Sequence, residues 1–451
     1  MKTKFEAIAS IVLGGVMALA VFAGCAGRED GGGNKELSFW CSWGTDVVIP
    51  LQKIIDGFNE SQDKYTVKVE QAGGIDDIRN TLASTKQRNL PSMFCGGATT
   101  PAIYANAEYL APLQDFIDED SEDWTSSLFP AVKSSYSDRD GNLLGHPIGV
   151  SCAGYVVNTD LLAKVKKTDG TSYTLEDLTS FKAISEVATK AVQQNVCRYG
   201  LSFQSGVDLL DMLTMQGVDY VDNDNGWTAN ATKTLLYEKD TATYAAVKDV
   251  ADIVDDLYKN NVGLAMGGAG PDKNAFIGNN MLFWKTTNST AYISLSGNAN
   301  ANFNWAFITS VGVNESARYK NQALSEGTGI YIANTGDKEE MEGAYQFIKY
   351  LAKPENKLYW ATTIGYVAYS NDILDEYKDW ADENYPSANN IISSLKNSEA
   401  SLRLPYVNVN LLSPSWTLLT SVANNKTRGE VDTYIQDAAT TINRNLKLAN
   451  L

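Results

Sequence analysis

The sequence predicts an α/β protein of two domains, because strand and helix patterns alternate along it and because 451 residues are too many for one small core. The predicted elements near the N-terminus are a strand at 37–40, a helix after Thr45 or Asp46, a strand at 65–71, a helix at 75–86 and a strand at 92–94. This order is typical of a parallel sheet flanked by helices.

The carboxyl ends of these strands form the first candidate ligand site, since ligands of open α/β sheets bind beyond them. The segments there are CSWG at 41–44, QAGG at 71–74 and CGGA at 95–98. Nearly all of these residues are small, apart from one tryptophan. We therefore predict that Trp43 contacts a ligand, whereas Trp40, inside the strand, belongs to the core.

The rest of the chain continues the mixed pattern. Asp140-Gly141 indicates a hairpin, because this pair suits a type I′ turn, and the strand-like run at 149–158 is where we expect the first crossing between domains. Predicted helices cover 175–194 and 241–258. Three more follow near the C-terminus, marked by Asp337 with Glu340, by Pro354, and by an apolar stripe from Val431 to Leu446.

Composition excludes several classes of function. The net charge of −17 makes nucleic acid an improbable partner and an anionic membrane surface a repulsive one. A single histidine, His146, and no CxxC pair leave little for a metal site or for Ser-His or Cys-His catalysis, so we expect no cofactor and no metal. Cys41, Cys95, Cys152 and Cys197 could form two disulfides or stay free, and their spacing leaves both states open.

A calcium-like run, DNDNG at 222–226, does not fit the loop of calcium-binding hands. Aligning Gly226 with the invariant glycine of that loop places Val221 at the first ligand position. We therefore interpret the run as a polar turn before Trp227.

The first 25 residues have the features of an export signal. Lys2 and Lys4 precede an apolar run from Ala7 to Ala23, which ends in small residues before Cys25. This junction resembles the lipobox of bacterial lipoproteins, although Phe22 stands where Leu, Val or Ile is usual. The resemblance implies a signal peptide at 1–24 and a lipid on Cys25, with the glycine-rich stretch 25–35 as a flexible tether. The other interpretation is an uncleaved membrane anchor.

The order of motifs resembles the extracellular solute-binding proteins of ABC importers, of the carbohydrate-binding type that includes maltodextrin- and glycerol-3-phosphate-binding proteins. The matching fragments, in chain order, are LSFWCSWG, NLPSMFCGG, EYLAPLQDFI, GNLLGHPIGVSCAGYVVNTDLL, FIGNNMLFWKTTNS, EGTGIYIAN, EGAYQFIKYLAKPENKLYWATTIGYVAYSND and RGEVDTYIQDAATTINRNL. Each fragment alone is weak. Together they cover the whole chain after the predicted signal.

This resemblance implies a two-lobed fold like that of periplasmic binding proteins, in which each lobe is a sheet flanked by helices and a hinge joins the lobes. We assign 36–147 plus 323–353 to the N-terminal lobe and 148–322 plus 354–451 to the C-terminal lobe. The ligand is then expected between the lobes, which close around it. The implied partners are a sugar, a membrane permease and the membrane itself through Cys25, and we expect a monomer on the outer face of the cell membrane.

A sugar site needs flat aromatic rings together with amides and hydroxyls, and the chain has 9 Trp and 23 Tyr. Besides Trp43, we predict ligand contacts from residues in the family motifs and near polar turns. These residues are Tyr155, Trp227, Trp284, Thr286, Gly329, Tyr366 and Arg403. Core packing is the competing interpretation for the aromatic residues, and a surface salt bridge is the competing one for Arg403.

Two other functions stay open. In the first, the same fold binds glycerol 3-phosphate or a glycerophosphodiester, which Arg403 could hold through paired hydrogen bonds. In the second, the chain is a secreted glycosidase, which would need two carboxylates at a fixed separation. The expected cleft segments CSWGT, QAGG, CGGA, FWKTT and GYVA carry no carboxylate, so we expect no enzymatic activity.

Overall fold

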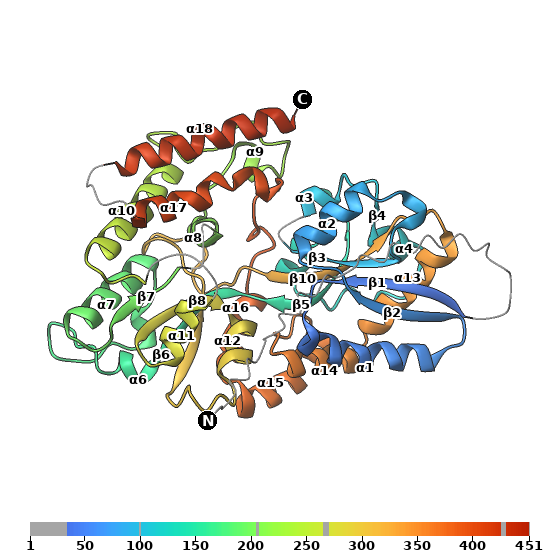
Figure 1. Cartoon of the computed structure of the whole chain (residues 1–451), viewed down its shortest axis with the longest axis horizontal. Helices are drawn as coiled ribbons and strands as arrows, with labels where there is room; N and C mark the ends of the chain where they lie inside the picture. Colours follow the sequence, from blue (N-terminus) through green and yellow to red (C-terminus); the bar gives the residue numbers. More distant parts are fainter. Residues whose placement is uncertain (1–33, 99–100, 204–206, 265–269, 425–429, 451) are drawn as a thin grey trace, which may run out of the picture.

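A computed structural model describes residues 34–98, 101–203, 207–264, 270–424 and 430–450, and the chain folds into two α/β lobes side by side (Figure 1). The predicted signal peptide and Cys25 lie outside the described residues. Among the described residues, no helix has both the length and the apolar character needed to cross a membrane.

The sheet of the first lobe has the strand order β2-β1-β3-β10-β4, with β5 also paired to β10. β1 runs parallel to β2 and β3, whereas β10 is antiparallel to β3, β4 and β5. The strands are β1 (Lys35–Cys41), β2 (Tyr65–Gln71), β3 (Met93–Gly97), β4 (Leu110–Ala111), β5 (His146–Ser151) and β10 (Glu326–Ala333). The three N-terminal strands confirm the parallel α/β pattern that the sequence predicts.

Helices of the first lobe pack on this sheet through apolar stripes. The apolar residues Leu51, Ile54, Ile55 and Phe58, at helical spacing in the first helix, are buried, and Val47 at its start is partly buried. The side chain of Asp337 accepts hydrogen bonds from the amides of residues 339 and 340, which confirms it as a helix cap. The helices are α1 (Thr45–Ser61), α2 (Ile75–Ser84), η1 (Gln87–Asn89), α3 (Pro101–Tyr104), α4 (Leu113–Glu119), α5 (Pro130–Ser135), α13 (Lys338–Leu351) and α14 (Pro354–Ile364).

The sheet of the second lobe has the strand order β7-β8-β6-β9. β7 and β8 are parallel, and β6 is antiparallel to both β8 and β9. The strands are β6 (Ala153–Asn158), β7 (Tyr199–Leu201), β8 (Met281–Thr287) and β9 (Trp305–Thr309). A second apolar core, separate from that of the first lobe, lies between this sheet and its helices.

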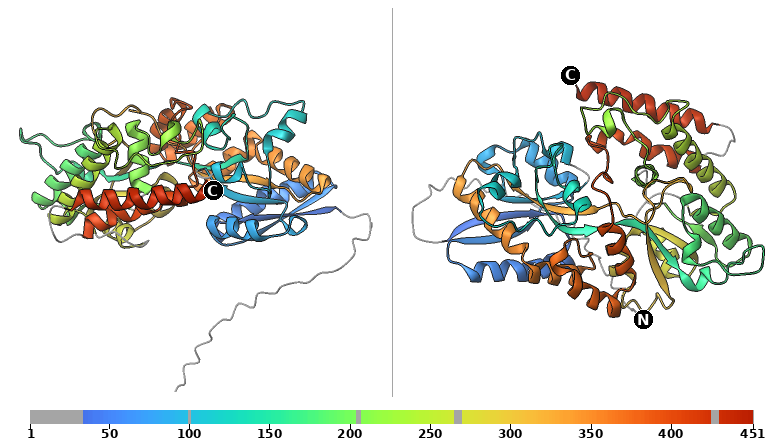
Figure 2. Two further views of the ribbon diagram at one scale, coloured as in Figure 1. Left: turned by 90° about the horizontal axis from the view of Figure 1, so that it is seen from above. Right: turned by 180° about the vertical axis from the view of Figure 1, so that it is seen from behind.

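The remaining helices surround the second lobe or lie between the lobes. α16 contacts α5 of the first lobe and β9 of the second. In both views of Figure 2, the C-terminal end of α18 points toward the first lobe. These helices are α6 (Thr159–Leu162), η2 (Leu175–Asp177), α7 (Phe181–Gln193), α8 (Val207–Gln216), α9 (Asp222–Asn225), α10 (Ala242–Lys259), α11 (Pro271–Ile277), α12 (Asn288–Leu295), η3 (Asn371–Ile373), α15 (Leu374–Asn384), α16 (Ser387–Lys396), η4 (Val409–Leu412), α17 (Pro414–Asn424) and α18 (Val431–Ala449).

Three local predictions differ from the structure in detail. The helix predicted at 175–194 begins at Phe181, because Ser180 caps it through the amide of Ala183. The hairpin at Asp140-Gly141 forms, but only Gly141 of the pair has a positive φ, so the turn is not of type I′. Helix α14 packs against α1 of the first lobe, although the sequence analysis assigned residues 354–364 to the second.

The structure confirms the predicted polar turn at 222–226 and decides whether the cysteines are paired or free. The run at 222–226 forms a tight polar turn, in which Gly226 is left-handed at φ 81°. The four described cysteines are free thiols, and three of them are fully buried.

Candidate ligand-binding cleft

Strand ends from both sheets meet where the chain crosses between the lobes. In the first lobe, Gly97 at the end of β3 lies beside Thr328 near the start of β10. In the second, Thr287 at the end of β8 pairs with Ala153 at the start of β6. Because ligands bind beyond the carboxyl ends of strands, this meeting point is the candidate cleft.

An aromatic group lies on the first-lobe side of the cleft. The ring centroid of Trp43, just past β1, is 5.5 Å from that of Trp360 on α14. Tyr366 follows the left-handed cap Gly365, and its ring centroid is 6.2 Å from that of Trp360. Burial raises the pKa of Tyr366 to about 12. The structure thus brings Trp43 and Tyr366, 323 positions apart in the sequence, into one group.

A glycine makes room for this group on the strand that crosses between the lobes. A Cβ atom on Gly149 of β5 would lie 2.6 Å from the ring of Tyr366, closer than side chains normally approach.

The side chain of Gln71, at the end of β2, donates to the backbone carbonyl of Trp43 at 2.8 Å. Two of the three strand-end segments that the sequence singled out are therefore in direct contact.

A buried charged cluster lies on the second-lobe side. Nζ of Lys285 on β8 is 3.1 Å from Oδ2 of Asp211 and 3.7 Å from Oδ1 of Asp208, both on α8. Nζ also donates to Oγ of Ser310 at 3.0 Å and lies 5.6 Å from the ring centroid of Tyr155. All five side chains are buried, so their charges must compensate one another.

Glu326 joins this cluster from the first strand residue of β10. Burial and the neighbouring charge of Asp211 raise the pKa of Glu326 well above its usual range. Oε1 of Glu326 and Oδ1 of Asp211 are buried and have no hydrogen-bond partner within the described residues. Because β10 belongs to the first-lobe sheet and Asp211 to the second lobe, this charge interaction acts between the lobes at the crossing.

Sequence reasoning missed these carboxyl groups, because it searched only the expected strand-end segments. Asp208 and Asp211 lie three residues apart on a helix that follows β7, and Glu326 directly precedes the glycine-rich run GTG. A charged residue next to such a run was the signal that could have found Glu326. For the two aspartates, i,i+3 spacing on an otherwise apolar helix was the available signal.

A third group lies on the second lobe, beside the turn that ends at Gly226. The guanidinium carbon of Arg403 is 3.3 Å from the ring centroid of Trp227, and Nε1 of that indole donates to the carbonyl of Leu404 at 3.1 Å. A cavity of about 100 Å³ adjoins both side chains. Trp227 is buried with the cation over its ring, which leaves little of the indole for stacking on a ligand.

The other predicted site residues lie inside the lobes. Nε1 of Trp284 donates to Oδ2 of Asp272 at 3.0 Å, so Trp284 points away from Lys285, as strand alternation requires. Thr286 is buried and pairs with Gly154 in the sheet. Gly329 packs under Tyr136, whose ring would be 2.6 Å from a Cβ atom at that position. Within the described residues, no cluster of metal-ligating side chains occurs.

Comparison with known proteins identifies the family. The family model described as "Bacterial extracellular solute-binding protein" matches residues 53–386, well over half of the chain. The chain belongs to the bacterial extracellular solute-binding proteins. Members similar to this chain are substrate-binding proteins of ABC importers and not enzymes, and the family name implies a location outside the cytoplasm.

Individual relatives of this solute-binding protein are distant in sequence. The sn-glycerol-3-phosphate-binding periplasmic protein UgpB of Escherichia coli is 21% identical over 343 residues, which cover 75% of each chain. The cyclic α-maltosyl-1,6-maltose binding protein of Arthrobacter globiformis matches with a TM-score of 0.70 at 15% identity, over 92% of this chain and all of that one. UgpB of Mycobacterium tuberculosis, solved with glycerophosphocholine, matches with a TM-score of 0.71 at 15% identity, over 93% of this chain and all of that one. These structures confirm the two-lobed fold.

Proposed function

We propose that this solute-binding protein captures a carbohydrate, either a monosaccharide or an oligosaccharide, between its lobes and delivers it to a membrane permease. The observation that carries the proposal is the partly exposed Trp43 just past β1, which packs on Trp360 next to the buried Tyr366. The exposed part of the Trp43 ring suits the apolar face of a sugar.

The charge of the cleft also favours a neutral ligand. Lys285 is a buried cation on the strand beside β6, and it is already compensated by Asp208 and Asp211. A phosphate group placed there would meet carboxylates instead of a free cation. Carboxylates accept hydrogen bonds from sugar hydroxyls without this repulsion.

A glycerophosphodiester is the second candidate, and Arg403 favours it. Within the described residues, the guanidinium of Arg403 has no hydrogen-bond acceptor. Burial lowers the pKa of Arg403 from its strongly basic ordinary value. The curated relative UgpB of Escherichia coli binds sn-glycerol 3-phosphate by name. A ligand that reached Arg403 could offer it a phosphate oxygen pair.

A thermal-shift panel separates the two candidates. Maltose, a longer maltodextrin and glycerophosphocholine are added separately, and the melting temperature is measured at a ligand concentration far above micromolar. Binding to the folded state alone adds about 2.7 kcal/mol at 100 times the dissociation constant. We expect stabilisation by a sugar; stabilisation by glycerophosphocholine alone would contradict the carbohydrate proposal and support the second candidate.

The proposal includes a lipid anchor on Cys25 and no catalytic activity. Cys25→Ser should move the protein from the membrane fraction to the soluble fraction while ligand affinity stays unchanged. Membrane retention of the Cys25→Ser protein would contradict lipidation at this residue. Turnover of a chromogenic glycoside by the purified protein would contradict the non-catalytic proposal.

A further inference from the structure

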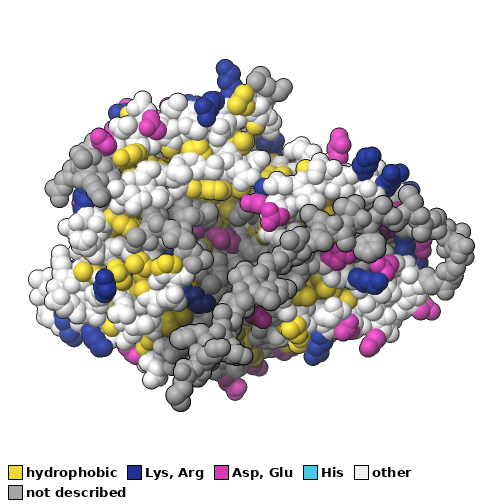
Figure 3. Space-filling view, in the orientation of Figure 1, with side chains coloured by type: hydrophobic (Ala, Val, Ile, Leu, Met, Phe, Trp, Pro, Cys, Tyr) yellow, Lys and Arg dark blue, Asp and Glu magenta, His cyan; other side chains and the backbone are white. Residues whose placement is uncertain are grey.

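Arg139 of the first lobe forms two hydrogen bonds and a ring contact with the second lobe. Arg139 lies in the turn between α5 and β5, and its Nε donates to the carbonyl of Gly226 at 3.0 Å. Its Nη2 donates to Oδ1 of Asn230 at 2.9 Å. The guanidinium carbon is also 4.7 Å from the ring centroid of Tyr406. All three partners belong to the second lobe, and Figure 3 shows acidic and basic side chains together where the lobes meet.

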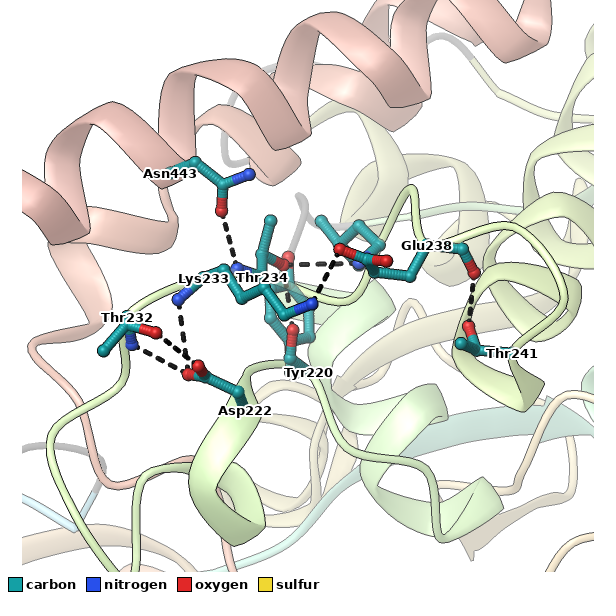
Figure 4. Close-up of polar contacts among 9 residues, drawn as sticks. Tyr220, Asp222, Thr232, Lys233, Thr234, Glu238, Thr241 and Asn443 are labelled. Atoms are coloured by element: carbon teal, nitrogen blue, oxygen red, sulfur yellow. Dashed lines mark hydrogen bonds and ion pairs between the residues drawn. The ribbon is translucent and has the colours of Figure 1, made fainter.

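Residues 226–230, the segment of the second lobe that Arg139 contacts through Gly226 and Asn230, are held by hydrogen bonds on both sides (Figure 4). Before it, Asp222 accepts a hydrogen bond from the amide of Thr232 at 2.7 Å, which closes the loop at its base. After it, the amide of Thr234 donates to Oδ1 of Asn443 on α18 at 2.7 Å. These hydrogen bonds hold residues 226–230 in place. The loop therefore does not lose conformational entropy when Arg139 binds to it.

Aromatic rings extend the contact into the second lobe. The ring centroid of Tyr406 is 4.6 Å from that of Trp227, which in turn carries Arg403 on its ring. Arg139 of the first lobe thus lies over the ring of Tyr406, and Arg403 of the second lobe lies over the ring of Trp227. A cavity of about 160 Å³ adjoins this stack and is lined from both lobes, with Asn106 on the first and Asn450 on the second.

We propose that Arg139 is an affinity-determining residue that acts by holding the two lobes together. The inference rests on the proposed function, in which the lobes close on a ligand. Contacts that exist only when the lobes are together shift the open–closed equilibrium toward the closed form. Because the apparent dissociation constant is inversely proportional to the closed fraction, loss of these contacts weakens ligand binding at a distance from the Trp43 and Tyr366 group.

Arg139→Ala tests this proposal, with Arg198→Ala as the matched control. Arg198 also lies over a tyrosine ring, that of Tyr199 at 5.1 Å, but this contact stays inside one lobe. The radius of gyration of each ligand-free protein is measured by small-angle X-ray scattering. The dissociation constant is measured with maltose and with glycerophosphocholine. Melting temperatures report whether each variant is folded.

We expect Arg139→Ala to have a larger radius of gyration and about tenfold weaker binding, since two hydrogen bonds and a ring contact are lost. Arg139→Lys should lie between it and the wild type, because an ammonium group cannot make the paired contact. Arg198→Ala should match the wild type. An unchanged radius of gyration for Arg139→Ala overturns the proposal, whatever happens to affinity. Failure of both probes to bind the wild type would count against the proposed function, while the scattering comparison would still decide the role of Arg139.

Discussion

The side chain of Asn288 accepts a hydrogen bond from the amide of Cys152 at 2.7 Å, and this contact fixes the chain where it passes between the lobes. The amide of Asn288 donates back to the carbonyl of Cys152 at 3.1 Å, and its Nδ2 donates to the carbonyl of Gly365 at 3.3 Å. Asn288 is fully buried. One side chain of α12 therefore ties the crossing at Cys152 to the loop that carries Tyr366.

Asn288→Ala should lower the free energy of unfolding by about 2–3 kcal/mol, because it leaves a buried amide and a buried carbonyl without partners. Urea unfolding followed by tryptophan fluorescence measures the loss. The control is Asn300→Ala at an exposed position, which should stay within about 0.5 kcal/mol of the wild type. Equal losses in both variants would mean that Asn288 does not secure the crossing.

Gly149→Ala should disturb the ligand site through Tyr366. The added methyl would lie 2.6 Å from the ring of Tyr366, so the ring must move, and we expect a loss of about 1–3 kcal/mol in stability together with weaker ligand binding. Gly44→Ala is the matched control in the segment after β1, because a Cβ atom there meets no atom within 4 Å. Calorimetric titration of both variants compares their affinities. Wild-type affinity and stability for Gly149→Ala would contradict the placement of Tyr366 against β5.

Lys285→Met should destabilise the protein by about 3–5 kcal/mol, since it leaves the buried carboxylates of Asp208 and Asp211 without their cation. Lys248→Met is the control, because its ion pair with Asp252 lies on the helix surface and should contribute under about 1 kcal/mol. Chemical unfolding at pH 7 measures both. A small effect of Lys285→Met would show that the cluster is neutralised in another way.

Glu326→Gln should make the free energy of unfolding less dependent on pH. The pKa of Glu326 is higher in the folded protein than in the unfolded chain, so its contribution is complete below about pH 4.3 and is lost as the pH rises through the folded-state value. The charged or titratable groups that interact with it are Lys285, Asp208, Asp211, Tyr136 and Cys152. Glutamine has a similar shape and cannot ionise.

Urea unfolding at pH 5 and at pH 8 checks this expectation. The stability of Glu326→Gln relative to the wild type should rise between the two pH values. Glu60→Gln at an exposed position of α1 should leave the pH dependence unchanged. Parallel pH profiles for wild type and Glu326→Gln would contradict a raised pKa of Glu326 in the folded protein.

The structural features that could be predicted from the sequence are those that depend on residues close together along the chain. The alternation of strands and helices, the apolar stripe of α1 and the cap at Asp337 each depend on residues within a few positions of one another. The order of family motifs then predicted the two-lobed fold. Trp43 was also accessible to this reasoning, because a residue just past a parallel strand lies at the strand ends of the sheet.

Only the tertiary structure decided which side chains share a site. The Trp43 and Tyr366 group, the charge interaction of Glu326 with Asp211 and the hydrogen bond of Arg139 to Gly226 each join segments more than 80 residues apart. Strand alternation required Trp284 and Lys285 to point in opposite directions, but the packing of α11 and α8 determined which of them entered the charged cluster. Local patterns encode the face of an element, whereas the partner of that face depends on how distant segments pack.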